Sequence, residues 1–206
     1  MAVVNRGILG GTFDPPHIGH LIIAEEARLK VPLDRVTFIP TGEPWRKAGR
    51  RISAAEDRLA MVRRAIADNP RFDCADLEVR RAGPTYTVDT LRALHQPGED
   101  LYLILGADAL RDLPNWHRPA DIAQLARIVV VGRPGWEDVE TAAGVAMVEG
   151  LAERLVLLNT PLIDVSATDL RARARRGESL RYLVPDAVAT YIQERDLYPS
   201  GSTDTL

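Results

Sequence analysis

Two histidines three residues apart, His17 and His20, lie in a stretch whose residue types suit the binding of phosphate. The stretch GGTFDPPHIGH follows the short apolar run Ile8-Leu9 and precedes an amphipathic run over residues 21–29. A spacing of three at the start of a helix places both imidazoles on one side of it. They would lie beside backbone N–H groups without a partner in the helix, near the positive end of its dipole. Such a place attracts phosphate, so the pattern predicts a nucleotide-phosphate site.

The residues between the expected strand and the expected helix fit such a site. Gly10 and Gly11 would allow unusual backbone dihedrals and the close approach of a ligand. Pro15 and Pro16 would fix φ and hold the loop in place. Two simpler interpretations stay open: the double glycine can be only a turn, and a histidine pair at helical spacing can lie on the surface or in the core.

A metal centre is an alternative use of the same stretch, with Asp14, His17 and His20 as ligands. Catalytic zinc requires three protein ligands. The rest of the sequence offers no second histidine and cysteine cluster as a clear partner set. We therefore predict no metal ligand among the side chains.

The elements that must position this loop alternate between strands and helices, which predicts a parallel sheet with helices on both faces. Strands are predicted at residues 3–9, 35–39, 72–79, 101–105, 127–131 and 155–158. Helices are predicted at residues 18–30, 53–68, 88–94, 120–125 and 185–195, with a short one after residue 108 and another starting near residue 166. The run LYLIL is continuous and apolar, as expected for a central strand buried on both faces.

Three hydroxyl residues precede expected helices and are predicted to cap them. Ser53 opens a capping box with Glu56, and Thr87 precedes the helix at 88–94. Ser166 is predicted to cap the last-but-one helix, with Asp169 reaching back to it. Each hydroxyl would accept a hydrogen bond from an N–H group that has no partner in its helix.

Several charged side chains directly follow expected strands, where open α/β sheets bind their ligands. These cations include Arg46, Lys47 and Arg133. Ser166 opens a helix that carries Arg171 one turn in, which makes a second anion site. Because the carboxyl ends of parallel strands share one edge of the sheet, we expect these candidates to lie close to residues 11–20, which we call the histidine loop.

Three of these features have a plainer interpretation as well. Asp108, just past the strand at 101–105, could hold a ribose hydroxyl or cap the short helix. Trp116 could pack in the core or offer a stacking face to a flat ring. The cations around Arg46 and Lys47 could simply form a solvated surface.

Length and composition fit one globular domain that neither coats nucleic acid nor spans a membrane. The 206 residues are 46% hydrophobic and 27% charged, with a formal net charge of −3. No run approaches the length of a membrane span, and the N-terminal residues lack the apolar region of a signal peptide. The single cysteine, Cys74, excludes an intramolecular disulfide. We expect a cytoplasmic protein without nucleic-acid or membrane partners; the sequence is compatible with a homo-oligomer.

The stretch GGTFDPPHIGH resembles a signature of the (H/T)xGH nucleotidyltransferases, and VSATDLR, residues 165–171, resembles their second signature, I-S-x-T-x-x-R. The blocks FIPTGEPWRK, GPTYTVDTL, LILGADAL with a later tryptophan, and VVVGRPG are together similar to the bacterial nicotinate mononucleotide adenylyltransferases. The match implies a Rossmann-like doubly wound parallel sheet with a small C-terminal helical part at about 166–198. It implies one nucleotidyltransferase domain over residues 1–198. The remaining residues, 199–206, are predicted to form a disordered tail.

The resemblance implies transfer of AMP from ATP to nicotinate mononucleotide, which gives deamido-NAD and pyrophosphate. The mononucleotide phosphate would attack the ATP α-phosphate directly and in line, so no catalytic base or covalent intermediate would be needed. His17 and His20 would contact the ATP phosphates and stabilise the transition state. Mg²⁺ would accompany ATP through its phosphates and keep several waters.

The resemblance also implies binding roles for other residues. Those on the ATP side are Gly10, Gly11, Thr12, Phe13, Arg46, Lys47, Gly106, Asp108, Arg133, Ser166, Thr168 and Arg171. Thr85, Tyr86 and Trp116 match the pyridine side, where backbone amides near the threonine would take the carboxylate and the tryptophan would stack on the ring. One departure concerns the residues before Lys47, where Trp45-Arg46 replaces the commoner Pro-His.

Three other protein classes share parts of this pattern. A phosphopantetheine adenylyltransferase would have no reason for the GPTYT and GADAL blocks. A class I aminoacyl-tRNA synthetase also carries HIGH, but it needs a second lysine-rich signature loop and a tRNA-binding domain. A non-catalytic nucleotide-binding regulator would not need an intact histidine pair. The preference between nicotinate and nicotinamide mononucleotide depends on backbone N–H groups, which a sequence does not show.

Overall fold

The computed structural model of the chain describes residues 3–42, 52–132, 145–161 and 163–200. The chain divides into two compact units, each built from three stretches of sequence. Unit 1 comprises Met1–Gly10, Ile23–Thr37 and Tyr86–Leu162, and unit 2 comprises Gly11–Ile22, Phe38–Thr85 and Ile163–Leu206. The histidine loop therefore belongs to the same unit as the second signature, although more than half of the chain lies between them.

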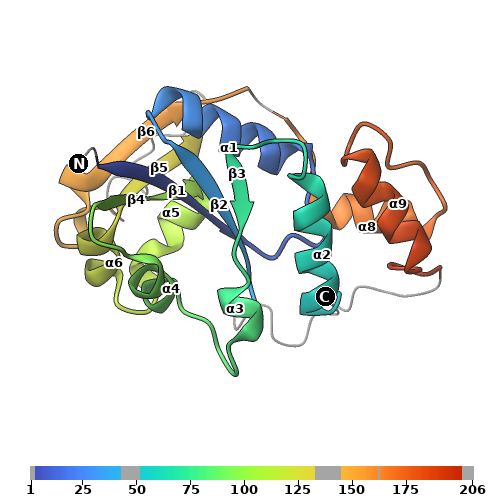
Figure 1. Ribbon diagram of the computed structural model, residues 1–206, viewed down its shortest axis with the longest axis horizontal. Helices are drawn as coiled ribbons and strands as arrows, with labels where there is room; N and C mark the ends of the chain where they lie inside the picture. Colours follow the sequence, from blue (N-terminus) through green and yellow to red (C-terminus); the bar gives the residue numbers. More distant parts are fainter. Residues whose placement is uncertain (1–2, 43–51, 133–144, 162, 201–206) are drawn as a thin grey trace. The chain divides into compact units, whose positions relative to one another are not determined.

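Six strands form the sheet in the order β3-β2-β1-β4-β5-β6, and the chain can be followed through them in Figure 1. They are β1 (Val4–Gly11), β2 (Arg35–Pro40), β3 (Phe72–Cys74), β4 (Glu99–Gly106), β5 (Arg127–Gly132) and β6 (Leu155–Asn159). The pairs β1/β4, β4/β5 and β5/β6 are parallel. The chain builds one half of the sheet outward from β1 and then the other half, which is the doubly wound order. The predicted fold class is confirmed.

Helices alternate with these strands much as the periodicity predicted. The α-helices are α1 (Ile18–Lys30), α2 (Ala55–Ala65), α3 (Leu77–Arg80), α4 (Thr87–Leu94), α5 (Ala107–Asp112), α6 (Pro119–Leu125), α8 (Ala167–Arg175) and α9 (Asp186–Glu194), with 3₁₀ turns η2 (Leu113–Asn115) and η3 (Ala152–Arg154). The last two α-helices form the predicted small C-terminal helical part. Among the residues described, no helix is both long enough and apolar enough to cross a bilayer.

The central strands are apolar because both of their faces are covered. Successive residues of a strand point to opposite faces, and the neighbours Leu103 and Ile104 of β4 are 2% and 1% exposed. Val129 and Val130 of β5 are both fully buried. Leu105 lies opposite Val130 in the register of these two strands. The continuous apolar run of the sequence thus marks a central strand, as predicted.

The strand predicted at 72–79 is wrong in its second half. β3 ends at Cys74, the Ala75 N–H still donates to the Phe38 carbonyl at 3.0 Å, and α3 begins at Leu77. The Asp76 carboxylate pairs with Arg80 at 2.8 Å and with Arg63 at 3.2 Å. These ion pairs support a helical turn where the alternation of side chains alone favoured an extended chain.

Two of the three predicted helix caps are also wrong. α2 starts after Ala54 without a side-chain cap, and the Ser53 N–H instead donates to Asp14 Oδ2 at 3.3 Å. Thr87 lies inside α4, and the N-cap position is Tyr86, again without a side-chain cap. The third cap, Ser166 of α8, is confirmed, because its Oγ accepts from the Asp169 N–H at 3.1 Å.

Two predicted segments fall partly outside the described residues. The segment 137–150 is acidic and weakly patterned, which predicts a peripheral helix or loop, and it is described only from residue 145 onward. The tail predicted at 199–206 is described for its first two residues, and the Ser200 hydroxyl donates to the Arg175 carbonyl at 3.0 Å.

Gly7 generates a stability prediction, because a Cβ there would lie 2.9 Å from Leu33 Cδ1 and 3.1 Å from both Ile104 Cδ1 and Val36 Cγ2. Gly7→Ala should lower the free energy of unfolding by about 1–3 kcal/mol through overpacking. Urea denaturation measures the change. Gly10→Ala, in the same strand but with nothing within 4 Å of the added Cβ, is the matched control. Equal unfolding midpoints for the two variants would contradict this account of the packing.

Candidate functional site

The double glycine ends strand β1 and does not form a turn, so this part of the prediction is wrong. Gly10 and Gly11 are its last two residues, and neither has a positive φ. The left-handed residue is Phe13, with φ 50°. A Cβ on Gly11 would lie 3.0 Å from Phe13 Cζ, so this glycine makes room for the phenyl ring, whereas nothing lies within 4 Å of a Cβ on Gly10. Among the described residues, Gly10 therefore has open space beside it at the end of the strand, as expected where a ligand approaches closely.

The histidine pair is held by a hydrogen bond between its own members. His17 precedes α1 directly, and its backbone N–H donates to Nδ1 of His20, the third residue of the helix, at 3.1 Å. This is the second half of a capping box, with an imidazole where glutamate is usual. The ring centroids lie 3.7 Å apart with an interplanar angle of 35°, so the predicted one-sided placement is confirmed. Because Nδ1 of His20 accepts, the proton of its neutral ring is on Nε2.

His17 is the more buried of the two histidines and is neutral at pH 7. Its side chain is 8% exposed, and burial lowers its pKa from 6.5 to about 4. Its Nδ1 is buried and has no hydrogen-bond partner among the described residues. Phe13 packs against the other imidazole edge-on, with its ring centroid 5.0 Å from that of His20. The histidine pair at the N-terminus of α1 thus packs against the apolar ring of Phe13 through His20.

The second signature meets the histidine loop within unit 2. Arg171 Nη1 donates to the Asp14 carbonyl at 2.9 Å, across 157 residues of sequence. Its Nη2 reaches Thr168 Oγ1 at 3.5 Å. The Ile18 N–H, at the start of α1, donates to the Leu183 carbonyl at 3.0 Å. The structure therefore brings the two predicted anion sites together.

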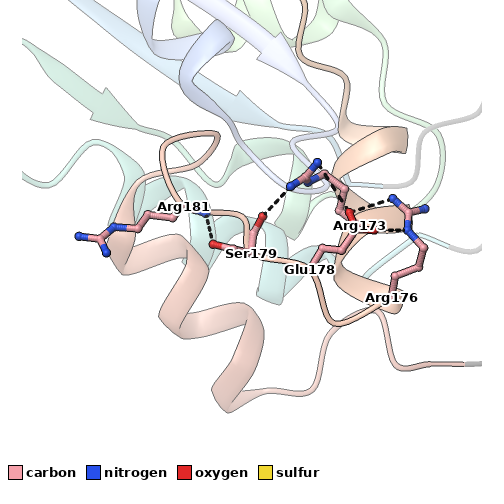
Figure 2. Close-up of polar contacts among 5 residues, drawn as sticks. All are labelled: Arg173, Arg176, Glu178, Ser179 and Arg181. Carbon is pink, nitrogen blue, oxygen red and sulfur yellow. Dashed lines mark hydrogen bonds and ion pairs between the residues drawn. The ribbon is translucent and has the colours of Figure 1, made fainter.

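Two neighbouring arginines, Arg173 in α8 and Arg176 directly after it, contact residues at the C-terminal end of that helix. Figure 2 shows Arg176 in a two-point contact with Glu178, at 2.6 and 3.0 Å, and Arg173 donating to the Ser179 carbonyl at 3.2 Å. Gly177 follows the helix with φ 69°, and the Glu178 N–H donates to the Arg173 carbonyl at 3.0 Å, which is a Schellman turn. These two cations stabilise the C-terminus of α8, whereas Arg171 is bonded to the histidine loop.

A buried arginine, Arg58 of α2, was not predicted as part of the site. It is 1% exposed, and its guanidinium donates to the carbonyls of Thr12 at 2.9 Å, Gly42 at 2.8 Å and Ser53 at 3.0 Å. Burial lowers its pKa, and the nearby Asp14 carboxylate opposes that effect. Arg58 also lies three residues before Met61 and seven before Ala65, on the buried face of α2. The position of a charged residue on the apolar face of a helix is the sequence signal that could have predicted a buried role for Arg58.

Asp14 is a second residue that was missed as part of the loop's support. Its side chain is 3% exposed, and the two carboxylate oxygens accept from the Tyr198 hydroxyl at 2.7 Å and from the Ser53 N–H at 3.3 Å. Both oxygens are thus used to hold the loop. The described residues contain no group of three histidine, cysteine, aspartate or glutamate side chains arranged to bind a metal.

In unit 1 the predicted residues group around the end of β4. Gly106 precedes α5, has open space beside it and lies opposite Val131 in the register with β5. Asp108 lies in the first turn of α5, does not cap it and pairs with Arg111 at 3.0 Å. The capping interpretation of Asp108 is therefore excluded, and its side chain is 96% exposed.

The aromatic residues of the predicted pyridine side are held by polar partners. Trp116 is half-buried, and its Nε1 donates to Asp112 Oδ2 at 3.2 Å. The Tyr86 ring lies 4.5 Å from the His117 ring, centroid to centroid. Thr85, in unit 2, is 5% exposed, and its hydroxyl is buried without a hydrogen-bond partner among the described residues. The predicted residues Arg46, Lys47 and Arg133 lie outside the described residues.

Comparison with known proteins places the chain among nucleotidyltransferases. A family model described as cytidylyltransferase-like matches residues 8–173. A relative from Roseiflexus sp. (strain RS-1), named "probable nicotinate-nucleotide adenylyltransferase", is 53% identical over 93% of this chain and 96% of its own. A relative of the same name from Herpetosiphon aurantiacus is 48% identical over 93% of this chain and 97% of its own.

Solved structures share the fold at much lower identity. The Plasmodium falciparum nicotinic acid mononucleotide adenylyltransferase complexed with NaAD has a TM-score of 0.74 to this chain at 19% identity. The likeness covers 95% of this chain and 97% of that one. At that identity the likeness supports the fold, while the relatives above carry the family.

Arg58→Met tests the buried guanidinium. Three carbonyls would lose their donor and Asp14 its nearby positive charge, so the free energy of unfolding should fall by about 3–5 kcal/mol. Urea denaturation followed by circular dichroism measures the loss. Arg63→Met, on the exposed side of the same helix, should cost less than about 1 kcal/mol. Similar losses in both variants would show that the three bonds of Arg58 contribute little.

The buried His17 predicts that acid weakens the fold. Between pH 6.5 and about 4 the unfolded chain binds a proton that the folded His17 does not, so stability falls as the pH falls through this window. Going from pH 7 to pH 5, this histidine should account for roughly 2 kcal/mol of lost unfolding free energy. Urea titrations at both pH values measure it, and His17→Gln should lose correspondingly less. An equal loss in both proteins would contradict the assignment.

Proposed function

We infer, from the premise that the chain belongs to the cytidylyltransferase-like family and within it to the nicotinate-nucleotide adenylyltransferases, that it transfers AMP from ATP to nicotinate mononucleotide. The products are deamido-NAD and pyrophosphate, so the reaction is a step of NAD biosynthesis. The single observation that carries the chemistry is the histidine pair at the N-terminus of α1, with Arg171 bonded to the same loop.

The ATP phosphates are the groups that fit this end of unit 2. The N-terminus of α1 carries the positive end of the helix dipole beside the two imidazoles, and the neutral ring of His20 has its proton on Nε2. A phosphate beside His17 would raise the pKa of that imidazole, because a nearby anion favours its charged form. Both histidines could then donate to phosphate oxygens as negative charge grows on the leaving group.

The reaction itself needs positioning more than acid–base chemistry. An oxygen of the mononucleotide phosphate forms a bond to the α-phosphorus of ATP while the bond from that phosphorus to the bridging oxygen breaks. The electron pair leaves with pyrophosphate, and no proton has to be removed from the nucleophile. Charge neutralisation by His17, His20 and Arg171 and alignment of the two phosphates supply the catalysis.

The pyridine ring of the second substrate is assigned to Thr85, Tyr86 and Trp116. Trp116 is anchored at one edge through Nε1 and is only half-buried, which suits a stacking face. The Thr85 hydroxyl has no hydrogen-bond partner among the described residues, which suits a polar ligand group. Backbone N–H groups near this threonine would take the nicotinate carboxylate.

Mg²⁺ fits this chain as an ion carried by the phosphates. The donors gathered around the histidine loop are N–H groups and a guanidinium, and the Asp14 carboxylate is already occupied by Tyr198 and Ser53. Hard cations prefer oxygen ligands, which ATP and water provide. When bound, Mg²⁺ would neutralise charge on the pyrophosphate that leaves. We place the reaction in the cytoplasm, as the sequence predicts.

Pyrophosphate release tests the function. With ATP and Mg²⁺, nicotinate mononucleotide should support release, nicotinamide mononucleotide should support less, and phosphopantetheine none. His17→Ala and His20→Ala should each lower kcat on the order of 10²–10³-fold, because each removes one contact that stabilises the developing charge. His95→Ala, an exposed histidine just after α4, is the matched control.

Each alternative outcome has a definite meaning. Undiminished activity in a His17→Ala, His20→Ala double variant would refute the assigned chemistry. Release with phosphopantetheine alone would identify another adenylyltransferase. ATP binding without release for any acceptor would identify a regulator that binds nucleotide without turnover.

A further inference from the structure

The segment after α9 is turned back toward the histidine loop by a tight helix end. The Leu197 N–H donates to the Ile192 carbonyl at 3.0 Å, and the Asp196 N–H donates to the Gln193 carbonyl at 3.2 Å. Asp196 has φ 46°, so it takes the left-handed position that ends a Schellman turn. Tyr198 follows with φ 66° and a side chain only 8% exposed. The turn thus delivers one aromatic side chain into the interior of unit 2.

The hydroxyl of Tyr198 is hydrogen-bonded to Asp14 of the histidine loop. It donates to Asp14 Oδ1 at 2.7 Å, while the Ser53 N–H donates to Oδ2 at 3.3 Å. Burial, together with the Asp14 carboxylate, raises the pKa of Tyr198 above its usual value, so the hydroxyl keeps its proton and remains a donor. A bond between a neutral hydroxyl and a buried carboxylate is among the stronger kinds of hydrogen bond.

The loop depends on this bond because it can make few of its own. Pro15 and Pro16 separate Asp14 from His17, and neither has an N–H group to donate. Their fixed φ angles make the four residues a stiff connection, so a shift of Asp14 is passed on to His17. The backbone carbonyl of Asp14 also accepts a hydrogen bond from Arg171 Nη1 at 2.9 Å. One residue therefore sets the positions of a histidine and of the arginine assigned to phosphate.

We propose that Tyr198 is a positioning residue for adenylyl transfer, acting through Asp14 on His17 and Arg171. The proposal rests on the proposed function, because it assigns Tyr198 a task in that reaction. Tyr198 acts through its bond to Asp14. Its effect is on alignment, which governs the rate of an in-line displacement more than the affinity for ATP.

A matched pair of tyrosines provides the test. Tyr198→Phe removes the bond to Asp14, and Tyr191→Phe removes a bond of the same kind, from the Tyr191 hydroxyl to Asp57 Oδ1 at 2.8 Å, between α9 and α2. Steady-state kinetics with ATP, Mg²⁺ and nicotinate mononucleotide are measured at a temperature where circular dichroism shows both variants folded. We expect Tyr198→Phe to lose on the order of tenfold in kcat with little change in the KM for ATP. Tyr191→Phe should keep the wild-type kcat.

A second readout follows the imidazoles directly. The ¹⁵N-edited NMR signals of His17 and His20 should move in Tyr198→Phe and stay in place in Tyr191→Phe, without any substrate present. Wild-type kcat and unmoved imidazole signals in a folded Tyr198→Phe would overturn the proposal and leave Tyr198 with a purely structural role. If the wild-type protein releases no pyrophosphate, the proposed function fails, and the NMR comparison still decides whether Tyr198 positions the loop.

Asp14→Asn keeps the test decisive if Tyr198→Phe does not fold. The neutral amide has one oxygen for two donors, so the Tyr198 bond is either lost or reduced to a weaker bond between neutral groups, and the loop should shift. The same loss of kcat and the same movement of the imidazole signals are expected. A folded Asp14→Asn with wild-type kcat would overturn the proposal equally.

Discussion

The guanidinium of Arg58 is the interaction on which unit 2 depends. It is buried and directs its N–H groups to three carbonyls that are far apart in sequence, those of Thr12, Gly42 and Ser53. Loops at the end of parallel strands leave carbonyls that no ladder satisfies, and a buried carbonyl without a donor is costly. One forked cation meets this need at three places and fixes the separation between them. Asp14, close by, provides the opposing charge.

The chemistry of the loop follows from this support. Arg58 donates to the Thr12 carbonyl, and Tyr198 and Ser53 donate to the Asp14 carboxylate. Between these two fixed residues, Phe13 has a left-handed backbone and its ring packs against His20 and Phe38. The two imidazoles then lie against each other at the N-terminus of α1, with the Phe13 ring edge-on to His20. Burial keeps His17 uncharged at pH 7, so the folded protein does not have to hold a buried charge at this position.

Most of the architecture was predictable because it follows from short-range patterns. The apolar run of β4 and the periodicity of α1 each report local burial, and both elements lie where they were expected. The predictions that were wrong depended on distant partners: Ser53 gives its N–H to Asp14, and β3 stops where Asp76 pairs with Arg63 and Arg80. The support of the site was missed for the same reason. The sequence of α2 places Arg58 on the apolar face of the helix, but it does not predict that the guanidinium donates to three carbonyls outside the helix.

The hydrogen bonds of Asp14 also have a consequence for folding during synthesis. Its partners Arg171 and Tyr198 are 157 and 184 residues away in sequence. Contacts of such separation form late, because a long stretch of chain must be ordered first. On the ribosome the histidine loop is synthesised long before Arg171 and Tyr198, so it stays incomplete until both of these residues have emerged. A nascent chain that stops short of Tyr198 would therefore carry the histidines without the arrangement that makes them useful.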